Sequence, residues 1–415
     1  MRVCLIIILF IAGTLKSYPS TIKVCSSCSI KTIKEALAAA QYADTIEIFE
    51  GLYKEGPMVI DKPLFITGIN WPKLDGESEY EIVNVTADSV TITGCIFQNV
   101  GVSYLYDNAA ISLEKSSGSH IYNNKIINAF FGIYAKNSSG LIIENNEIHG
   151  EAEEEITSGN AIHLWYCNNI TVRNNIASNH RDGIYLEFVN KSIIENNLSE
   201  MNLRYGLHFM FSNNDKYRSN TFRNNGAGVA VMFSKFIEMS GNTFELNWGA
   251  SSYGLLLKEI TDAVISGNRI QSNTVGIFAE GANRIHIKEN VFQANGWAMK
   301  ISGSCMDNVI SKNNFILNTF DLSTDSSRSS NNFDGNYWSE YTGYDLDGDG
   351  KGDVPFRPVK LFSYLVGRVE PSIVLLRSFF INIVDFAEKV TPMFTPKNLA
   401  DNSPLMKPWK DAANY

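Results

Sequence analysis

Short apolar segments recur along most of the chain, and each begins with a glycine or an alanine. One and three residues beyond that small residue the side chain is apolar in every segment. Such alternation predicts a β-strand with one buried face. The repeat length of about 22 residues is too short for a helix pair and fits one coil of a parallel β-helix. The small residues are Gly132, Ala161, Gly183, Gly206, Gly228, Gly254, Gly276 and Ala298.

Asparagine residues mark the same repeat at a second position. Stacked coils place equivalent residues one strand spacing, about 4.8 Å, apart. The asparagines can therefore form a buried amide ladder at a tight corner. The pattern predicts an all-β protein, a right-handed parallel β-helix with an N-terminal helical cap and a C-terminal helical or extended segment. The members of the series are Asn124, Asn146, Asn175, Asn197, Asn220, Asn242, Asn268, Asn290 and Asn314.

The remaining sequence divides around this repeat. The N-terminus has a charged start, an apolar run and a polar end, which is typical of a signal peptide and predicts export. Thr32 and Glu35 have the spacing of a capping box, and a helix there would cover the open end of the barrel. The predicted divisions are a signal peptide over 1–17, an N-terminal cap over 18–43, coils over 44–330, a calcium-loop region over 331–360 and a C-terminal segment over 361–415.

Side chains that point away from the barrel could support chemistry. Over the middle coils they are aromatic, histidine and methionine, which favours a binding surface over a solvated one. His208 and Met210 share one face of a strand, and Met232 takes the position of Met210 on the next coil. One imidazole and two thioethers form a soft ligand set that suits Cu(I). The surrounding binding face is predicted to contain His163, Trp165, Tyr185 and Glu187.

A second interpretation of this surface needs no metal. Methionine and aromatic side chains also form adaptable contact surfaces for other proteins. Insertions at 151–159 and 247–253 bracket the patch, which predicts a walled site under either interpretation. His163 lies two coils from His208, about 9.6 Å away, so the two imidazoles are not expected to share one ion.

The cysteines offer one pair with a suggestive spacing. Cys25 and Cys28 could bind a soft metal, exchange thiols or close a small disulfide beside the cap. Cys95, Cys167 and Cys305 have no partner by spacing and are expected to be buried.

An acidic loop follows the coils. Asp345, Asp347, Asp349 and Asp353 alternate with glycine and other residues in the spacing of a calcium-binding loop. Phe356 stands where a sensor loop has its bidentate glutamate, so we expect a structural Ca²⁺ site.

The C-terminal segment contains more apolar residues than one exposed helical region can carry. We expect residues 361–409 to dock the β-helix onto a membrane transporter. Packing of the tail along the coils is the alternative.

Charge excludes one class of partner. The chain has 35 basic and 44 acidic residues, a net charge of −9, so nucleic acid is not an expected partner.

Three motifs carry a family resemblance. The stretches 334–359 (DGNYWS…DLDGDG…DVP…RPV), 204–211 (RYGLHFMF) and 404–409 (PLMKPW) resemble the NosD family of nitrous oxide reductase maturation proteins. The resemblance implies a periplasmic, non-enzymatic accessory protein. Its implied partners are an ABC transporter permease, a copper chaperone and nitrous oxide reductase, whose copper–sulfide centre it would help to assemble.

An enzyme is the alternative, because β-helices often carry polysaccharide lyases, hydrolases and epimerases. Such chemistry needs clustered carboxylates. Glu187 and Glu280 are predicted to lie four coils apart, about 19 Å, which is too far for cooperation.

Overall fold

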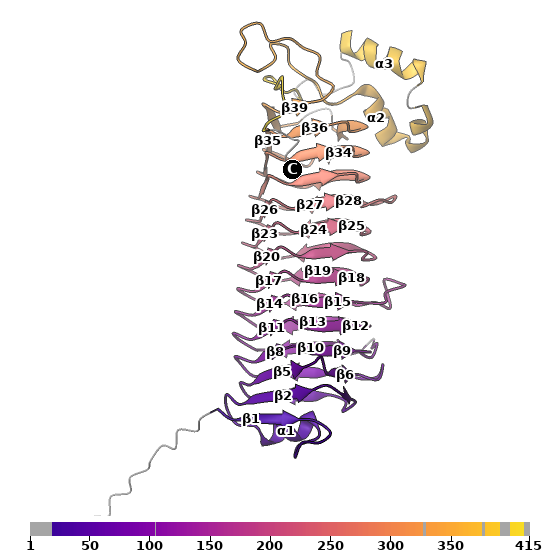
Figure 1. The fold of residues 1–415 in the computed structure, drawn as a ribbon. Helices are drawn as coiled ribbons and strands as arrows, with labels where there is room; N and C mark the ends of the chain where they lie inside the picture. Colours follow the sequence, from indigo (N-terminus) through magenta and orange to yellow (C-terminus); the bar gives the residue numbers. More distant parts are fainter. Residues whose placement is uncertain (1–18, 104, 327–328, 376–377, 391–398, 411–415) are drawn as a thin grey trace, which may run out of the picture.

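The computed structural model describes residues 19–103, 105–326, 329–375, 378–390 and 399–410. The predicted signal peptide lies outside this range, as do Met393 and Phe394 of the predicted tail. The described chain is a stack of coils, each contributing short strands to parallel sheets that run the length of the molecule (Figure 1). The predicted parallel β-helix is therefore confirmed.

Three sheets form the walls of the barrel. The first contains β1 (Thr21–Val24), β2 (Thr45–Phe49), β5 (Phe65–Ile69), β8 (Thr91–Thr93), β11 (His120–Tyr122), β14 (Ile142–Glu144), β17 (Thr171–Arg173), β20 (Ile193–Glu195), β23 (Lys216–Arg218), β26 (Glu238–Ser240), β29 (Val264–Ser266), β32 (His286–Lys288), β35 (Val309–Ser311) and β38 (Asn332–Asp334). The second contains β3 (Leu52–Tyr53), β6 (Lys73–Asp75), β9 (Ile96–Gln98), β12 (Lys125–Ile127), β15 (Glu147–His149), β18 (Ile176–Ser178), β21 (Leu198–Glu200), β24 (Thr221–Arg223), β27 (Thr243–Glu245), β30 (Arg269–Gln271), β33 (Val291–Gln293), β36 (Asn314–Ile316) and β39 (Tyr337–Trp338).

The third sheet has the longest strands and carries the predicted binding face. It contains β4 (Met58–Ile60), β7 (Val83–Val85), β10 (Ala109–Glu114), β13 (Phe131–Lys136), β16 (Ile162–Trp165), β19 (Asp182–Glu187), β22 (Tyr205–Met210), β25 (Ala227–Met232), β28 (Tyr253–Lys258), β31 (Val275–Glu280), β34 (Trp297–Ile301) and β37 (Phe320–Thr324).

The alternating apolar residues fill the barrel as predicted. Ile184, Leu207 and Val229, on successive coils, pair in register and are fully buried. They belong to one continuous core cluster that extends from Val24 to Leu399. Stacking of apolar side chains at equivalent positions thus supplies most of the apolar burial that stabilises the fold.

The asparagine ladder is present and differs from the prediction at one end. Each Oδ1 accepts hydrogen bonds from the backbone N–H and side-chain amide of the preceding member, as Asn197 does from Asn175 at 2.9 and 3.1 Å. At the ninth position of the series Asn313 occupies the ladder, and the predicted Asn314 lies just outside it. A second amide ladder, which the sequence pattern did not reveal, runs at another corner through Asn202, Asn225, Asn247, Asn273, Asn295 and Asn318.

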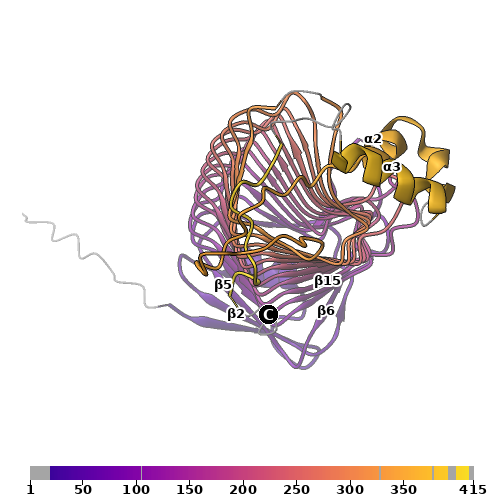
Figure 2. The same cartoon turned by 90° about the horizontal axis from the view of Figure 1, so that it is seen from above.

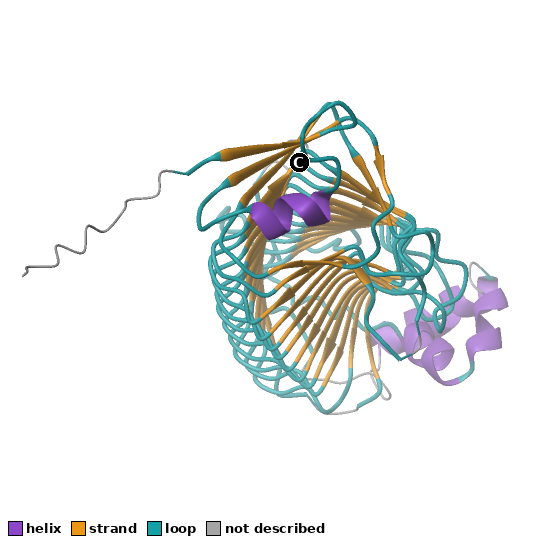
Figure 3. Ribbon diagram, turned by 90° about the horizontal axis from the view of Figure 1, so that it is seen from below, coloured by secondary structure: helices purple, strands orange, loops and turns teal. Residues whose placement is uncertain are grey.

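The N-terminal cap contains a short helix. Helix α1 (Ile33–Ala39) lies across the open end of the barrel (Figure 3). Thr32 and Glu35 form the predicted capping box, with the Glu35 N–H donating to the Thr32 hydroxyl at 3.2 Å. Nearby, Cys25 and Cys28 are joined as a disulfide, and Cys95 is one of the three buried free cysteines that the sequence predicted.

The C-terminal end differs from the predicted divisions in one way and agrees with them in another. Coils continue past residue 330, because β38 and β39 complete the last one, whereas the helical segment begins at Leu361 as predicted. Helix α2 (Leu361–Arg368), the 3-10 helix η1 (Glu370–Leu375) and helix α3 (Phe379–Val390) then stand beside the barrel end (Figures 1 and 2).

The end of the chain returns to the barrel. Leu399 is buried in the main core, and the backbone of Leu405 bridges to Tyr337. Asn314 exchanges two hydrogen bonds with the backbone of Trp409, at 2.7 and 2.9 Å. The described part of the tail therefore packs on the coils, which was the alternative to docking.

Candidate functional site

Outer-face residues of the third sheet stack in the predicted register. Tyr185 pairs with His208 in one row, while Met210 pairs with Met232 in the next. The strand spacing of about 4.8 Å separates the two methionines. His208 and Met210 alternate with buried Phe209 on the same strand, so both side chains point out of the barrel.

His208 is more buried than an outward position suggests. Its exposed fraction is 5%, because its ring stacks on Tyr185 with centroids 4.5 Å apart and contacts Tyr205 at 4.9 Å. Neither ring nitrogen makes a hydrogen bond to any part of the chain that the structure describes. A buried polar nitrogen without a partner is costly, and a bound water or ion is one way in which such a group is satisfied.

A buried ion pair lies beside His208, and the sequence pattern did not identify it. Asp182 Oδ2 is 3.6 Å from His208 Nδ1, and both carboxylate oxygens accept from Arg204 at 2.9 and 2.5 Å. Burial raises the pKa of Asp182, but the hydrogen bonds from Arg204 and the nearby Arg204 and His208 side chains outweigh it and lower the pKa to about 2. Asp182 is therefore an anion at neutral pH and faces His208 from one side. The sequence did contain a signal for Asp182, because this charged residue directly precedes Gly183 of the small-residue series, at the start of a buried strand.

His163 takes part in the same aromatic column as His208. Its ring contacts Tyr134 at 5.0 Å and Tyr185 at 4.7 Å. Burial, with the charge of Arg181, lowers the pKa of His163 to about 3, so the imidazole is neutral at neutral pH. The ring of Tyr185 lies between the rings of His163 and His208 and contacts both.

The two methionines lie at the edge of this buried cluster. Both are half-buried, and the Tyr185 hydroxyl donates to Met210 Sδ at 3.7 Å. Trp165 and Glu187 are also half-buried and precede Met210 in the same row, and Lys258 follows Met232. The thioethers are thus reachable from outside, whereas the imidazole of His208 is covered by the rings of Tyr185 and Tyr205.

The first inserted loop approaches the same cluster. Burial lowers the pKa of Arg204, but the carboxylate of Asp182 and, less strongly, that of Glu155 in the loop raise it overall. The loop therefore adds negative charge near the buried ion pair.

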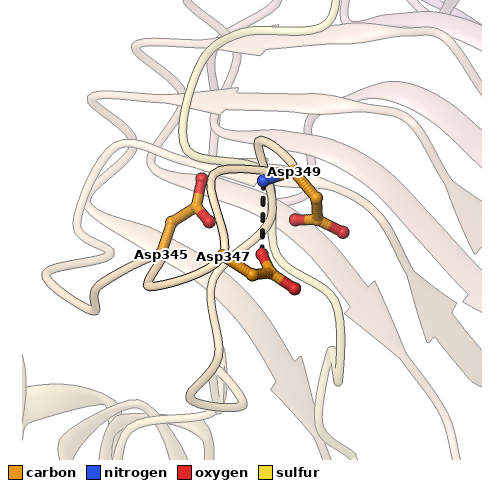
Figure 4. Close-up of side chains that lie close together, drawn as sticks. All are labelled: Asp345, Asp347 and Asp349. Carbon is orange, nitrogen blue, oxygen red and sulfur yellow. Dashed lines mark hydrogen bonds between the residues drawn. The ribbon is translucent and has the colours of Figure 1, made fainter.

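The calcium-like loop brings three of its four predicted ligands together. Carboxylate oxygens of Asp345, Asp347 and Asp349 lie within 4.8 Å of one another (Figure 4). Asp345 accepts from the backbone of Gly348 at 2.7 Å and Gly350 at 2.9 Å, and both glycines have positive φ.

Asp353, the fourth predicted ligand, is used differently. It accepts from the backbone N–H of Leu346 at 2.8 Å and is not part of the carboxylate cluster.

The helices beside the barrel leave an apolar surface open. Phe362, Val366 and Ile381 pack against Trp297 and Phe320 of the barrel. By contrast, Phe379 and Phe386 of α3 are 78% and 69% exposed, and Val374 and Ile383 are exposed with them. No helix among the described residues has the length and apolarity needed to cross a bilayer.

Comparison with known proteins decides the family. The model of the family described as "Periplasmic copper-binding protein (NosD)" matches residues 83–202 and 159–343. The "Probable ABC transporter binding protein NosD" of Pseudomonas aeruginosa is 31% identical over 391 residues, 90% of this chain and 88% of that protein. The chain belongs to the NosD family. The NosD protein of Stutzerimonas stutzeri is 27% identical over 373 residues, 85% of each chain.

Solved structures share the fold of this NosD-family chain. A GH136 lacto-N-biosidase from Eubacterium ramulus matches with a TM-score of 0.53 and 11% identity over 76% of this chain and 68% of that one. At this identity the match concerns the fold alone. In the chain itself, Glu187 and Glu280 lie four steps apart along the row, as predicted, and Glu280 lies 3.7 Å from Lys258.

Proposed function

We propose that this protein receives Cu(I) at His208, Met210 and Met232 and passes it on during assembly of the copper–sulfide centre of nitrous oxide reductase. In this proposal copper is cargo, and the protein is an accessory factor and not an enzyme. The observation that supports it most directly is His208, a buried imidazole with no hydrogen-bond partner for either nitrogen in the described structure, beside two thioethers on adjacent coils.

The orientation of His208 favours one ring nitrogen as the ligand. The Asp182 carboxylate lies nearest Nδ1, so the tautomer with its proton on Nδ1 faces the carboxylate and presents the lone pair of Nε2 to an ion. One neutral nitrogen and two neutral sulfurs suit a soft monovalent ion and serve Mg²⁺ or Ca²⁺ poorly. Because none of the three ligands carries a negative charge, the site would be able to release the ion again.

Partners follow from the family and from the exposed helix. We propose that the apolar face of α3, with Phe379 and Phe386, docks on the permease of an ABC transporter. A copper chaperone would deliver the ion, and nitrous oxide reductase would be the final recipient.

The acidic loop has a structural role in this proposal. Asp345, Asp347 and Asp349 would hold Ca²⁺, because carboxylate oxygens are the ligands that this ion prefers. The loop is also joined to the tail, since Gly352 donates to the Pro404 carbonyl at 2.8 Å. Bound Ca²⁺ would therefore stiffen the C-terminal end of the barrel.

Competition for Cu(I) against a chromogenic chelator tests the copper site. The triple variant His208→Ala, Met210→Ala, Met232→Ala should lose at least a hundredfold in affinity. The double variant His286→Ala, Met306→Ala removes exposed residues of the same types elsewhere and should bind as the wild type does. Equal affinity in the triple variant and the wild type would refute the site.

A further inference from the structure

A groove lies on the outer face of the third sheet, near the N-terminal end of the barrel. Its volume is about 620 Å³, and its floor consists of outward residues of β7, β10 and β13. Asn84, Ser112 and Tyr134 take equivalent positions on these strands, one strand spacing of about 4.8 Å apart. His208 lies three coils beyond Tyr134 in the same row. This N-terminal groove is therefore separate from the proposed copper site.

Two loops form the wall of the N-terminal groove. The first loop lies between β6 and β7, and the second lies between β9 and β10. The Gly101 N–H donates to the Tyr80 carbonyl at 3.1 Å, which joins the two loops. The Asn108 side-chain amide donates to the Gly101 carbonyl at 3.1 Å. Hydrogen bonds within and between the loops thus hold the wall in place.

The groove carries an excess of negative charge. Its charged lining residues are Glu79, Glu81, Asp107 and Lys136. Lys136 is already engaged by Glu114 of the adjacent strand, with Nζ and Oε2 3.4 Å apart. The three acidic lining residues form no ion pair with any described residue. Lys34 and Lys62 line a separate depression, which shares only Pro57 with the groove. The groove therefore favours a cationic ligand over an anionic one.

Two buried acceptors in the groove lack compensation. Asn84 Oδ1 is buried and accepts no hydrogen bond from any described residue. Burial raises the pKa of Glu81, and the charge of Lys136 and the Asn84 side chain offset this effect only in part. Asn84 thus lacks a donor, and Glu81 lacks sufficient positive charge. A ligand with positively charged N–H groups would supply both.

The carboxylates of the groove are too far apart to share one metal ion. Within the described part of the chain, the only three acidic, histidine or cysteine residues whose ligand atoms all lie within 4.8 Å of one another are Asp345, Asp347 and Asp349. The carboxylates of the groove would therefore contact separate parts of a larger ligand.

The lining also includes aromatic and aliphatic side chains. Tyr80, Val102, Leu105 and Tyr106 belong to it. Leu105 and Tyr106 are 87% and 72% exposed. Tyrosine rings attract ammonium and guanidinium groups, and aliphatic side chains cover the methylene groups that carry them. The groove is thus suited to cationic groups on a partly apolar chain.

We propose that the N-terminal groove binds an extended organic cation, whose ammonium or guanidinium groups contact Glu79, Glu81 and Asp107 above the polar floor. A basic peptide segment of a partner protein and a free polyamine share this chemistry. Binding is non-covalent and does not depend on the proposed copper site.

Isothermal titration calorimetry with two probes tests the groove. The probes are the peptide amide Gly-Arg-Gly-Arg-Gly and spermidine, and at least one should bind the protein with one-to-one stoichiometry. Tighter binding of the peptide would identify a polypeptide as the source of the cation, and tighter binding of spermidine would identify a polyamine. The same peptide with citrulline in place of arginine is neutral and should bind at least tenfold more weakly.

The variant Glu79→Gln, Glu81→Gln removes two charges from the groove and keeps the shape of the side chains. Its affinity for the preferred probe should fall at least tenfold, with an unchanged Tm. The control variant Glu151→Gln, Glu153→Gln removes two exposed charges from another loop. Because its net charge changes equally, it should bind the probe as the wild type does.

The floor is tested by Asn84→Val. Val59 takes the equivalent position on β4, so valine should be accepted by the strand. Loss of the unpaired Asn84 carbonyl should weaken probe binding severalfold without a change in stoichiometry.

Three outcomes would overturn the proposal. The first is the absence of saturable binding by both probes. The second is wild-type affinity in the Glu79→Gln, Glu81→Gln variant. The third is an equal loss of affinity in both glutamine variants, because the net charge of the protein would then attract the cation. The triple variant of His208, Met210 and Met232 should bind the probe normally, so the copper and cation proposals fail independently.

Discussion

One carboxyl group, that of Asp215, is buried in the barrel without a charged partner. Asp215 is fully buried, and its Oδ1 accepts from the Ser192 N–H at 2.7 Å while Oδ2 has no partner in the described chain. Burial raises the pKa of Asp215 to about 8, although the hydrogen bond from Ser192 lowers it. The carboxyl group is therefore protonated in the folded protein at neutral pH.

Replacement of Asp215 by asparagine should stabilise the protein at neutral and higher pH. A carboxyl whose folded pKa lies above its unfolded value of about 3.9 contributes stability below that value and loses it as pH rises toward 8. Asn308 and Asn331 occupy the equivalent position on later coils, so the amide fits. The Tm of Asp215→Asn should exceed that of the wild type by several degrees at pH 8, and the gain should shrink toward pH 4.

Thermal melts at pH 4, 6 and 8 check this prediction. The control is Asp61→Asn, at an exposed position, and this variant should change the Tm little at any pH. An Asp215→Asn protein with the same Tm as the wild type at pH 8 would contradict this prediction.

Asp182 differs because its charge is paired. The substitution Asp182→Asn leaves the partly buried guanidinium of Arg204 without its anion and should destabilise the fold by about 3 kcal/mol. It also removes the carboxylate that faces His208 Nδ1, so Cu(I) affinity should fall about tenfold.

Denaturant unfolding and chelator competition measure the two effects. The control is Asp262→Asn, because Asp262 and Arg284 form an equally bidentate pair at the surface, at 2.7 and 2.8 Å. That variant should lose less than about 1 kcal/mol and keep its Cu(I) affinity. An Asp182→Asn protein with wild-type Cu(I) affinity would show that Asp182 does not orient His208.

At the scale of elements, the acidic loop predicts a dependence on calcium. Chelation should lower the Tm, because Ca²⁺ at Asp345, Asp347 and Asp349 would bind the folded state alone. The variant Asp347→Ala, Asp349→Ala should melt at the same temperature with and without chelator. A wild-type Tm that does not respond to chelator would refute the calcium site.

Helix α3 gives a second prediction at this scale. The variant Phe379→Ser, Phe386→Ser should retain its Tm, because both side chains are exposed, but should lose at least tenfold in affinity for the transporter. Substitution of Leu52 and Leu105 by serine, also at exposed positions, is the control and should not affect association. Undiminished co-purification of the α3 variant with the transporter would exclude this face.

At the scale of the whole molecule, the tail closes the barrel. Asp401 Oδ2 accepts from Asn336 N and Nδ2 at 2.8 and 3.0 Å and from Trp338 Nε1 at 3.1 Å. Asn336 is the last member of the asparagine ladder, so Asp401 takes the place of the next coil's oxygen. Asp401 itself is fully buried.

Loss of this closure should be costly. Asp401→Ala leaves the buried donors of Asn336 and Trp338 without acceptors and should destabilise the fold by about 3 kcal/mol. Asp401→Asn keeps an acceptor and should cost less. Urea unfolding measures both, and equal stability of Asp401→Ala and wild type would contradict the capping role.

A chain that ends near Pro358 lacks this cap and is therefore not expected to fold as well as the full chain.

Local pattern was sufficient to predict the coils, the N-terminal cap and the rows of outward side chains. The coil repeat fixes which residues stack, because one residue of slippage would turn every core side chain outward. The register of Met210 with Met232 and the burial of Cys95 follow from that rule. The capping box at Thr32 is equally local.

Tertiary structure decided everything that depends on residues far apart or on what covers a side chain. The alternation predicts that His208 points out of the barrel. Its burial, however, depends on Tyr205 from the same strand and on Tyr185 from the preceding coil. The closing hydrogen bonds of Asp401 join residues more than sixty positions apart, and nothing in the tail sequence marks that contact. Periodicity determines the register of a β-helix, whereas packing determines which outward side chains are sheltered and where the chain end returns.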